Sequence, residues 1–402
     1  MRTLGELPLR DEACAPAAAG KTKLYFPNLN SLRFFAAATV IVSHVEQYKC
    51  YFGQPYICFP IDWGGLAVTL FFVLSGFLIT YLLLTERKLY RTVSVRSFYV
   101  RRILRIWPLY YLIAVLALFV LPHVATFQMP GISEHLARHY WWKAGFILTL
   151  FPNLALAAFM EVPYAAQLWS VGVEEQFYLV WPVVLKFTRR LAAVLVGIAV
   201  VVTLLSNGLL QGAVVALNAR LGWLGTEAAA DVDAVLTVFL ENLRISCMAI
   251  GGLAAYVHFK EKHRWLACLY FPGVQWAAYG AIIWIMLAGR AWPHEVYALL
   301  FAVIILNLAC NPRSVVNLEY RPLAYLGNIS YGIYMWHPLG VVLAIRLMLF
   351  MFGGVHGWIQ QFLAHAFAQA ISVAMAAASY HLFERRFLKM KDAFARIVGA
   401  RF

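Results

Sequence analysis

Ten apolar segments, each long enough to cross a bilayer, constrain the fold of this 402-residue chain. About 20 apolar residues in a helix span the ~30 Å hydrocarbon core of a membrane. The chain is 62% hydrophobic and 13% charged, about half the charged fraction of soluble domains. A β-barrel would instead show short alternating segments. We therefore expect an all-α, polytopic integral membrane bundle of about ten transmembrane helices, over residues 28–47, 63–84, 104–121, 168–186, 191–211, 238–258, 265–288, 295–310, 323–345 and 360–383.

The basic residues predict the orientation of this bundle. The net charge of +14 comes from short loops between apolar segments, which is the pattern of the positive-inside rule rather than of a nucleic-acid-binding protein. Most basic residues face the cytoplasm if both termini are cytoplasmic and 142–159 does not cross, so 142–159 is expected to be interfacial or re-entrant on the outer side. The domains are then a cytoplasmic segment 1–27, a membrane domain 28–383 and a basic cytoplasmic tail 384–402.

The first apolar helix carries Arg33 and His44, eleven residues apart. This spacing is close to three helical turns, so both side chains project from nearly one face and lie roughly 16 Å apart along the axis. Ionisable groups near hydrocarbon tend to mark function, and imidazole is the usual general base. The alternatives are a positive-inside flank for Arg33 and a carbonyl-bonded interfacial imidazole for His44.

Three arginines, Arg101, Arg102 and Arg105, stand at the expected cytoplasmic start of the third span. The positive-inside rule explains their charge but not the exclusive use of arginine. Planar guanidinium groups bind phosphate in a forked geometry that ammonium groups cannot adopt. The cluster therefore predicts a site for an anionic head group.

Two adjacent glutamates, Glu174 and Glu175, lie within the apolar stretch LWSVGVEEQFYLVWP. Neighbours on a helix point about 100° apart, so the two carboxylates cannot both face one partner. An intramembrane carboxylate is a functional candidate, and the alternative is an ion pair with an arginine that fixes the bundle. In the expected topology, both lie near the depth of His44.

Several further polar or aromatic side chains are candidates for the lining of a substrate site. His337 precedes the helix-kinking Pro338, and a hydrogen-bonded structural histidine is its alternative role. Arg244 lies early in the sixth span and requires a partner, for which a glutamate is a candidate. The expected lining residues are His337, Ser75, Trp169, Tyr331 and Arg244.

Cysteine spacing predicts no metal site in this chain. Cys50 and Cys58 share one short outer loop, where they form either a disulfide or two free thiols. The chain contains no GxSxG, P-loop, HExxH or CxxC motif, so no soluble hydrolase or nucleotide-hydrolysing domain is indicated.

Taken together, these segments resemble the acyltransferase-3 family, the membrane O-acyltransferases that modify bacterial glycans and some antibiotics. The resemblance covers about 25–388. It rests on Arg33 with His44 (the R-x10-H pattern) and on the stretches FFVLSGFLIT (71–80), RRILRIWPLYYL (101–112), LWSVGVEEQFYLVWP (168–182), ISYGIYMWHPL (329–339) and SYHLFERRF (379–387, with Glu384). Two positions depart from the family pattern: Thr69 replaces an acid, and Arg386 replaces a proline. The fused SGNH-type domain of many members is missing, which favours direct transfer to the acceptor.

The resemblance implies transfer of an acyl group, most simply acetyl, from cytoplasmic acyl-CoA to a hydroxyl of a glycan, glycolipid or small-molecule acceptor. The arginines would hold the donor's anionic head. His44 would act as general base oriented by Glu174 or Glu175, or as a transient acyl carrier. The expected location is a bacterial cytoplasmic (inner) membrane, in contact with lipid, and neither a metal nor a nucleic acid is required.

Two other classes of function remain open at this point. A transporter or flippase for a lipid-linked glycan would also contain intramembrane charges and spans broken by proline or glycine. No inverted repeat is visible, however, and the arginine cluster favours a bound head group. A regulatory scaffold without chemistry would not need Arg33, His44 and the two glutamates.

Overall fold

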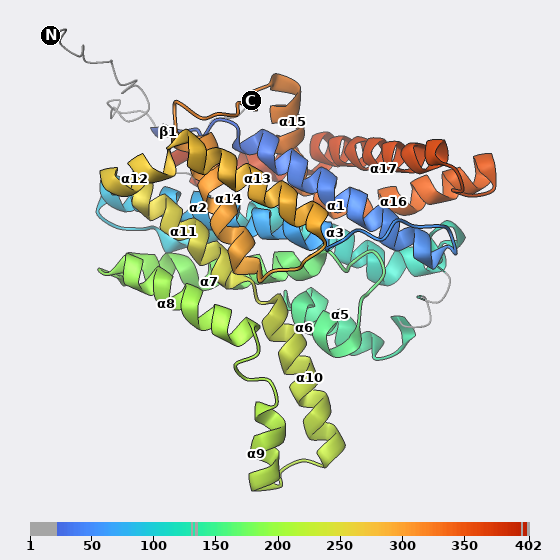
Figure 1. Cartoon of the computed structure of the whole chain (residues 1–402). Helices are drawn as coiled ribbons and strands as arrows, with labels where there is room; N and C mark the ends of the chain where they lie inside the picture. Colours follow the sequence, from blue (N-terminus) through green and yellow to red (C-terminus); the bar gives the residue numbers. More distant parts are fainter. Residues whose placement is uncertain (1–21, 130–131, 133–135, 395–396, 400–402) are drawn as a thin grey trace, which may run out of the picture.

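The computed structural model describes residues 22–129, 132, 136–394 and 397–399, and shows a bundle built almost entirely of helices (Figure 1). Apart from 22–27, the N-terminal segment expected over 1–27 lies outside the described residues. The helices are α1 (Leu29–Tyr51), α2 (Trp63–Tyr90), α3 (Val95–Val115), α5 (Tyr140–Leu148), α6 (Pro152–Phe159), α7 (Leu168–Phe187), α8 (Leu191–Ser206), α9 (Ala213–Leu221), α10 (Thr226–Asn242), α11 (Ile245–Phe259), α12 (His263–Leu269), α13 (Pro272–Ala288), α14 (His294–Cys310), α15 (Arg321–Asn328), α16 (Ser330–Phe352), α17 (Trp358–Ser379) and α18 (Arg385–Lys391).

Each of the predicted apolar segments coincides with a helix or with two consecutive helices. Five described helical stretches are long and apolar enough to cross a membrane, or six if the bent pair α12–α13 forms one span. They are Trp63–Tyr90, Val95–His123, Thr226–Phe259, Ser330–Phe352 and Trp358–Lys391. The chain is thus a multi-pass helical membrane protein, while ten crossings and cytoplasmic termini remain predictions.

Breaks in the helices lie where the local sequence disfavours continuation. The predicted segment 265–288 is divided into α12 and α13, which meet at 56°, because Pro272 at the start of α13 has no backbone N–H to donate to the preceding turn. The segment 142–159 is likewise divided between α5 and α6, which begins at Pro152. At about 1.5 Å per residue, neither half is long enough to span a bilayer.

The packing of α2 against α11 forms a central contact of the bundle, and two glycines make it possible. A Cβ atom added to Gly76 would overlap the backbone carbonyl of Met248, and one added to Gly251 would overlap that of Val73. Small residues at helix contacts let membrane helices approach closely. Ser75, the neighbour of Gly76, points about 100° away around α2 and reaches Glu174 on α7.

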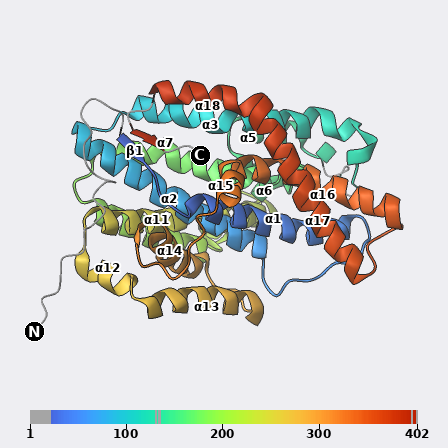
Figure 2. The same ribbon diagram turned by 90° about the horizontal axis from the view of Figure 1, so that it is seen from above.

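Two features lie outside the bundle core. Helix α9 and the first part of α10 form a hairpin that projects away from the other helices (Figure 1). The short strands β1 (Thr22–Leu24) and β2 (Ile397–Gly399) pair in parallel and lie side by side in Figure 2. This pairing joins segments from opposite ends of the described chain.

Candidate active site

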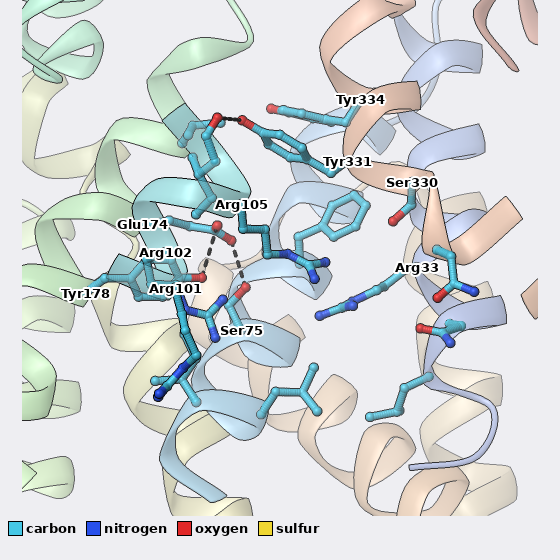
Figure 3. Close-up of a pocket in the computed structure, with 18 of the residues that line it drawn as sticks. Arg33, Ser75, Arg101, Arg102, Arg105, Glu174, Tyr178, Ser330, Tyr331 and Tyr334 are labelled. Atoms are coloured by element: carbon cyan, nitrogen blue, oxygen red, sulfur yellow. Dashed lines mark hydrogen bonds between the residues drawn. The ribbon is translucent and has the colours of Figure 1, made fainter. Parts of the chain in front are cut away.

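A cavity of about 480 Å³ opens where α1, α2, α3, α7 and α16 meet (Figure 3). We call it the arginine cavity. Its basic lining residues are Arg33, Arg101, Arg102, Arg105, Arg385 and Lys391, and Glu174 is the acidic residue in its wall. The lining therefore has a strong excess of positive charge and is suited to a polyanionic ligand.

The start of α1 is fixed so that Arg33 faces this cavity. Asn28, at the N-terminus of α1, has a left-handed backbone with φ 65°, and its side chain donates to the carbonyl of Leu308 (2.8 Å) and accepts from the N–H of Leu318 (2.6 Å). The Ser31 hydroxyl donates to the carbonyl oxygen of Leu318 (2.7 Å). These bonds hold the first turn of α1, and Arg33 follows one turn later.

The arginines of α3 are held in different ways. Arg101 donates to the carbonyl of Phe394 (3.0 Å) and lies 3.6 Å from the carboxylate of Glu86. Arg102 stacks over the rings of Phe98 and Tyr178, at 5.4 and 5.2 Å, and its Nε atom is buried without a hydrogen-bond partner. Arg101 is therefore committed to protein groups, whereas Arg102 retains capacity to bind a ligand.

Arg33 and Arg105 point into the same space from opposite walls of the cavity (Figure 3). Within the described part of the chain, neither guanidinium forms an ion pair or donates a hydrogen bond to a protein group. Two cations that face the same cavity repel each other unless an anion lies between them. The pair therefore favours binding of an anionic group in the cavity.

The two adjacent glutamates face different partners, as the helical geometry predicts. Glu174 accepts hydrogen bonds from the hydroxyls of Ser75 (2.8 Å) and Tyr178 (3.1 Å), both drawn in Figure 3. Glu175 accepts from the indole N–H of Trp107 (2.9 Å). Neither bonds to His44, so the predicted orientation of His44 by Glu174 or Glu175 is wrong: α7 directs both carboxylates toward α2 and α3.

His44 and His337 form a second site, which we call the histidine pair. Their ring centroids lie 4.8 Å apart. His44 Nδ1 donates to the carbonyl of Val40 (2.9 Å), and His337 Nδ1 donates to that of Tyr334 (2.6 Å). A carbonyl can only accept, so each neutral ring carries its proton on Nδ1 and keeps a lone pair on Nε2. The Nε2 atom of His337 is buried without a hydrogen-bond partner among the described residues.

Tyr334 separates the arginine cavity from the histidine pair. Its side chain lines the cavity, and its ring centroid lies 5.6 Å from that of His337. The Tyr334 hydroxyl shares a hydrogen bond with that of Ser170 (2.7 Å) and donates to the carbonyl of Gln167 (3.2 Å). His44 does not line the cavity, so the two sites are adjacent but divided by this tyrosine.

The remaining predicted lining residues divide into two groups. Ser75 and Tyr331 line the arginine cavity, and the Tyr331 hydroxyl donates to the carbonyl of Ile106 (2.9 Å). Arg244 and Trp169 do not line it and instead stack on each other at 5.2 Å.

A glutamate was the candidate partner for Arg244, and no glutamate bonds to it among the described residues. The guanidinium donates to the carbonyl of Gly65 (2.8 Å) and to the hydroxyl of Thr69 (3.4 Å). Thr69 is the position at which the family pattern has an acid. Arg244 therefore bonds to a backbone carbonyl and a hydroxyl rather than to a carboxylate.

Cys50 and Cys58, for which the sequence left a disulfide and two free thiols open, are both free and exposed. Cys50 lies in the last turn of α1, whereas Cys58 lies in the following loop with its thiol directed at the Phe59 carbonyl (3.9 Å). Of the two states left open for these thiols, the structure has the reduced one.

Sequence reasoning missed Arg385 and Lys391 as lining residues of the cavity. Both lie on α18, in the segment that the positive-inside rule had already explained as a basic tail. Glu384, just before them, accepts from the hydroxyl of Ser379 (2.9 Å) within a π turn, Tyr380–Glu384. This turn directs the chain back over α3. The adjoining FERRF stretch was the sequence signal from which basic lining residues in this segment could have been predicted.

A family model described as an acyltransferase domain matches residues 26–379. The chain belongs to the acyltransferase-3 family. This match contains the start of α1, the arginines of α3 and the histidine pair, whereas α18, with Arg385 and Lys391, lies beyond it.

Curated members of the acyltransferase-3 family resemble most of this chain. This chain is 27% identical to YrhL of Bacillus subtilis over 343 aligned residues. The alignment covers 80% of this chain and 49% of YrhL. Sequence identity is 25% over 352 residues (79% and 49%) with the peptidoglycan O-acetyltransferase OatA of Listeria monocytogenes, and 26% over 332 residues (78% and 50%) with the O-acetyltransferase OatA of Staphylococcus aureus. The chain spans about half the length of these relatives. No solved structure matches it.

Proposed function

We propose that this protein transfers an acetyl group from acetyl-CoA to a hydroxyl of a cell-envelope glycan or glycolipid. The observation that carries the proposal is the adjacency of the arginine cavity and the histidine pair, with Tyr334 between them. A site for a polyanionic donor thus lies beside two imidazoles with available lone pairs. The names of the relatives, which include peptidoglycan O-acetyltransferases, support the glycan as acceptor.

The donor fits the arginine cavity by charge and by reach. Coenzyme A combines a phosphate-rich head with a long, thin arm that ends in the thioester. Arg33, Arg102 and Arg105 would bind the phosphates, since guanidinium groups form paired, charge-assisted hydrogen bonds to them. The eleven residues from Arg33 to His44 correspond to roughly 16 Å of helix, so the arm would extend along α1 toward the histidine pair.

The proposed chemistry is a direct acyl transfer assisted by His44. Its Nε2 atom accepts the proton of the acceptor hydroxyl while the hydroxyl oxygen attacks the thioester carbonyl. The carbon–sulfur bond then breaks, and the coenzyme A thiolate leaves with the proton that His44 returns. The products are an O-acetyl ester and free coenzyme A. A variant of this mechanism would form a transient acyl-His44 before the acceptor reacts.

The proposed topology places the two substrates on opposite sides of the membrane. With ten spans and cytoplasmic termini, the arginine cavity faces the cytoplasm, where acyl-CoA is made, and the His44 end of α1 faces outward. This orientation follows the positive-inside rule, and the location we propose is the cytoplasmic membrane of a bacterium. Accessibility of Cys50 and Cys58 to a membrane-impermeant thiol reagent in intact cells tests it, because both would then face outward.

Mass spectrometry of cell-envelope glycans and lipids from wild-type, deletion and His44→Ala strains tests the function. We expect an acetyl-sized mass to disappear on deletion and to remain absent in the His44→Ala strain, which also identifies the acceptor. Return of that mass with the variant would show that His44 is structural. Accumulation of an unmodified glycan inside the cell without a mass change would instead support transport of a lipid-linked glycan.

A further inference from the structure

Helix α18 forms the wall of the arginine cavity between α16 and α3. A Cβ atom added to Gly332, near the start of α16, would lie 3.3 Å from the carboxylate of Glu384, so the residue before α18 packs against α16. At the other end, the carbonyl of Phe394, three residues after Lys391, accepts a hydrogen bond from Arg101 of α3 (3.0 Å). Between these points α18 packs against α3, beside which it lies in Figure 2. Both ends of α18 are therefore held at helices that line the cavity.

One face of α18 carries the residues that line the cavity. They are Arg385, Leu388 and Lys391, at positions i, i+3 and i+6, which lie within about 120° around a helix. Arg386 and Lys389 belong to the same helix but do not line the cavity. The guanidinium of Arg385 is exposed and forms no ion pair or hydrogen bond with any described residue. Helix α18 thus presents one arginine and one lysine to the cavity.

This helix extends the positive lining toward the start of α3. Lys391 follows Arg385 by six residues, about 9 Å of helix, and lies just before the carbonyl that Arg101 contacts. Arg101 in turn precedes Arg105 by one helical turn, about 6 Å along α3. The cations of the cavity therefore form two groups, which we call the facing pair (Arg33 and Arg105) and the α18 pair (Arg385 and Lys391).

We propose that the α18 pair binds the 3′-phosphate of the donor coenzyme A and makes the protein selective for 3′-phosphorylated donors, an inference that rests on the proposed function. Coenzyme A carries its negative charge in two places: a diphosphate next to the pantetheine arm, and a monophosphate on the 3′ carbon of the ribose. With the arm extended along α1 toward the histidine pair, the diphosphate meets the facing pair. The ribose phosphate then lies beyond the diphosphate, toward the start of α3, where α18 supplies its two cations.

The other charged groups nearby do not take over the role of the α18 pair. Glu384, which directly precedes Arg385, accepts a hydrogen bond from the Ser379 hydroxyl (2.9 Å) and lies against α16. Arg101 is bound to protein groups. Helix α18 itself contains no acidic residue, and it follows the residues matched by the family model, 26–379. The α18 pair is thus a feature of this chain that family membership alone does not predict.

Two donors and two double variants test this inference. Dissociation constants for acetyl-CoA and for acetyl-dephospho-CoA, which lacks only the 3′-phosphate, are measured by isothermal titration. The full chain is used in lipid nanodiscs at fixed ionic strength, since salt screens exposed charges. Arg385→Gln with Lys391→Gln removes the α18 pair. Arg386→Gln with Lys389→Gln is the matched control, because it removes the same two kinds of charge from the same helix outside the cavity.

We expect the wild type to bind acetyl-CoA about tenfold or more tightly than acetyl-dephospho-CoA, the effect of one charge-assisted hydrogen bond. The variant without the α18 pair should lose this preference. Its affinity for acetyl-CoA should fall by a similar factor, while its affinity for acetyl-dephospho-CoA changes by less than about twofold. The control variant should keep the wild-type preference.

The outcomes separate this inference from the function on which it rests. Equal affinities of the wild type for the two donors would overturn the role of the α18 pair alone. Equal weakening of both donors in the variant, or a lost preference in the control, would also overturn it, because general charge or an anionic lipid near α18 would then explain the effect. Failure of the wild type to bind either donor would overturn the proposed donor as well. If the double variant does not fold, Arg385→Gln and Lys391→Gln are measured singly, and a full wild-type preference in both overturns the inference.

Discussion

The arginine cavity and the histidine pair differ in how their charged and polar groups are held. In the cavity, Arg33 and Arg105 point into open space without a protein partner among the described residues, and the volume is about 480 Å³. In the pair, both rings are fixed by backbone carbonyls within one helical turn, and His337 is completely buried. The cavity thus leaves cationic side chains without protein partners, whereas the backbone holds both rings of the pair in place.

Under the proposed function, donor binding and chemistry would fall to two adjacent sites that Tyr334 divides. Long cationic side chains can adapt to a flexible, polyanionic donor. A general base must instead be held near the position where the proton is transferred. Tyr334 lies between the two sites, because it lines the cavity and contacts His337. Substitutions on the two sides should therefore affect different kinetic constants.

His44→Ala should have the largest effect and should change the transfer rate alone. Removal of a general base lowers the rate by about 10²- to 10⁴-fold, while the arginine cavity is untouched. Acetyl transfer and acetyl-CoA affinity are measured on the same purified protein. An equal loss of donor affinity would show that the two sites are not functionally separate.

Arg105→Ala should mainly weaken donor binding, by about ten- to a hundredfold, because a lost charge-assisted hydrogen bond costs about 1.5–3 kcal/mol. Arg101→Ala is the comparison, since Arg101 is bound to Phe394 and Glu86. We expect it to lower thermal stability more than affinity. Isothermal titration with acetyl-CoA and thermal unfolding measure the two quantities, and the reverse pattern would contradict this division of roles.

Tyr334→Phe should reduce transfer about three- to tenfold, because a net hydrogen bond contributes about 0.5–1.5 kcal/mol. Ser170 keeps its own bond to the Gln167 carbonyl (3.2 Å), which limits the loss. Tyr331→Phe is the matched control, since its hydroxyl bonds to Ile106 away from the histidines. Equal effects of the two variants on kcat would show that Tyr334 has no special place between the sites.

The double variant Cys50→Ser with Cys58→Ser should have the smallest effect, within about 0.5 kcal/mol in the free energy of unfolding. Both thiols are exposed and free, so neither clamps the histidine end of α1. Thermal unfolding with and without reductant measures this. If the double variant loses much stability, and the wild type loses the same amount when reductant is added, the two cysteines form a disulfide.

The sequence predicted the helices well because a membrane imposes one dominant rule. Apolar stretches of about 20 residues must satisfy their backbone hydrogen bonds internally, and each predicted segment is helical. The separation of Glu174 from Glu175 also followed from helical geometry alone and is confirmed by their partners, Ser75 and Trp107. Local rules of this kind need no knowledge of tertiary packing.

Contacts between distant segments could not be predicted in this way. The commitment of Arg101 depends on a backbone carbonyl at Phe394, 293 positions away. The partner of Arg244 depends on how closely α2 approaches α11, which is set by Gly76 and Gly251.

The hairpin of α9 and α10 has a practical consequence for imaging this molecule. At 45.4 kDa, with little mass outside the bundle, single particles would be difficult to align in electron micrographs. The turn at Gly222–Gly225 projects away from the other helices (Figure 1), and exposed turns generally tolerate insertions. A rigid fiducial domain grafted there would add an orientation marker while leaving the cavity and the histidines untouched.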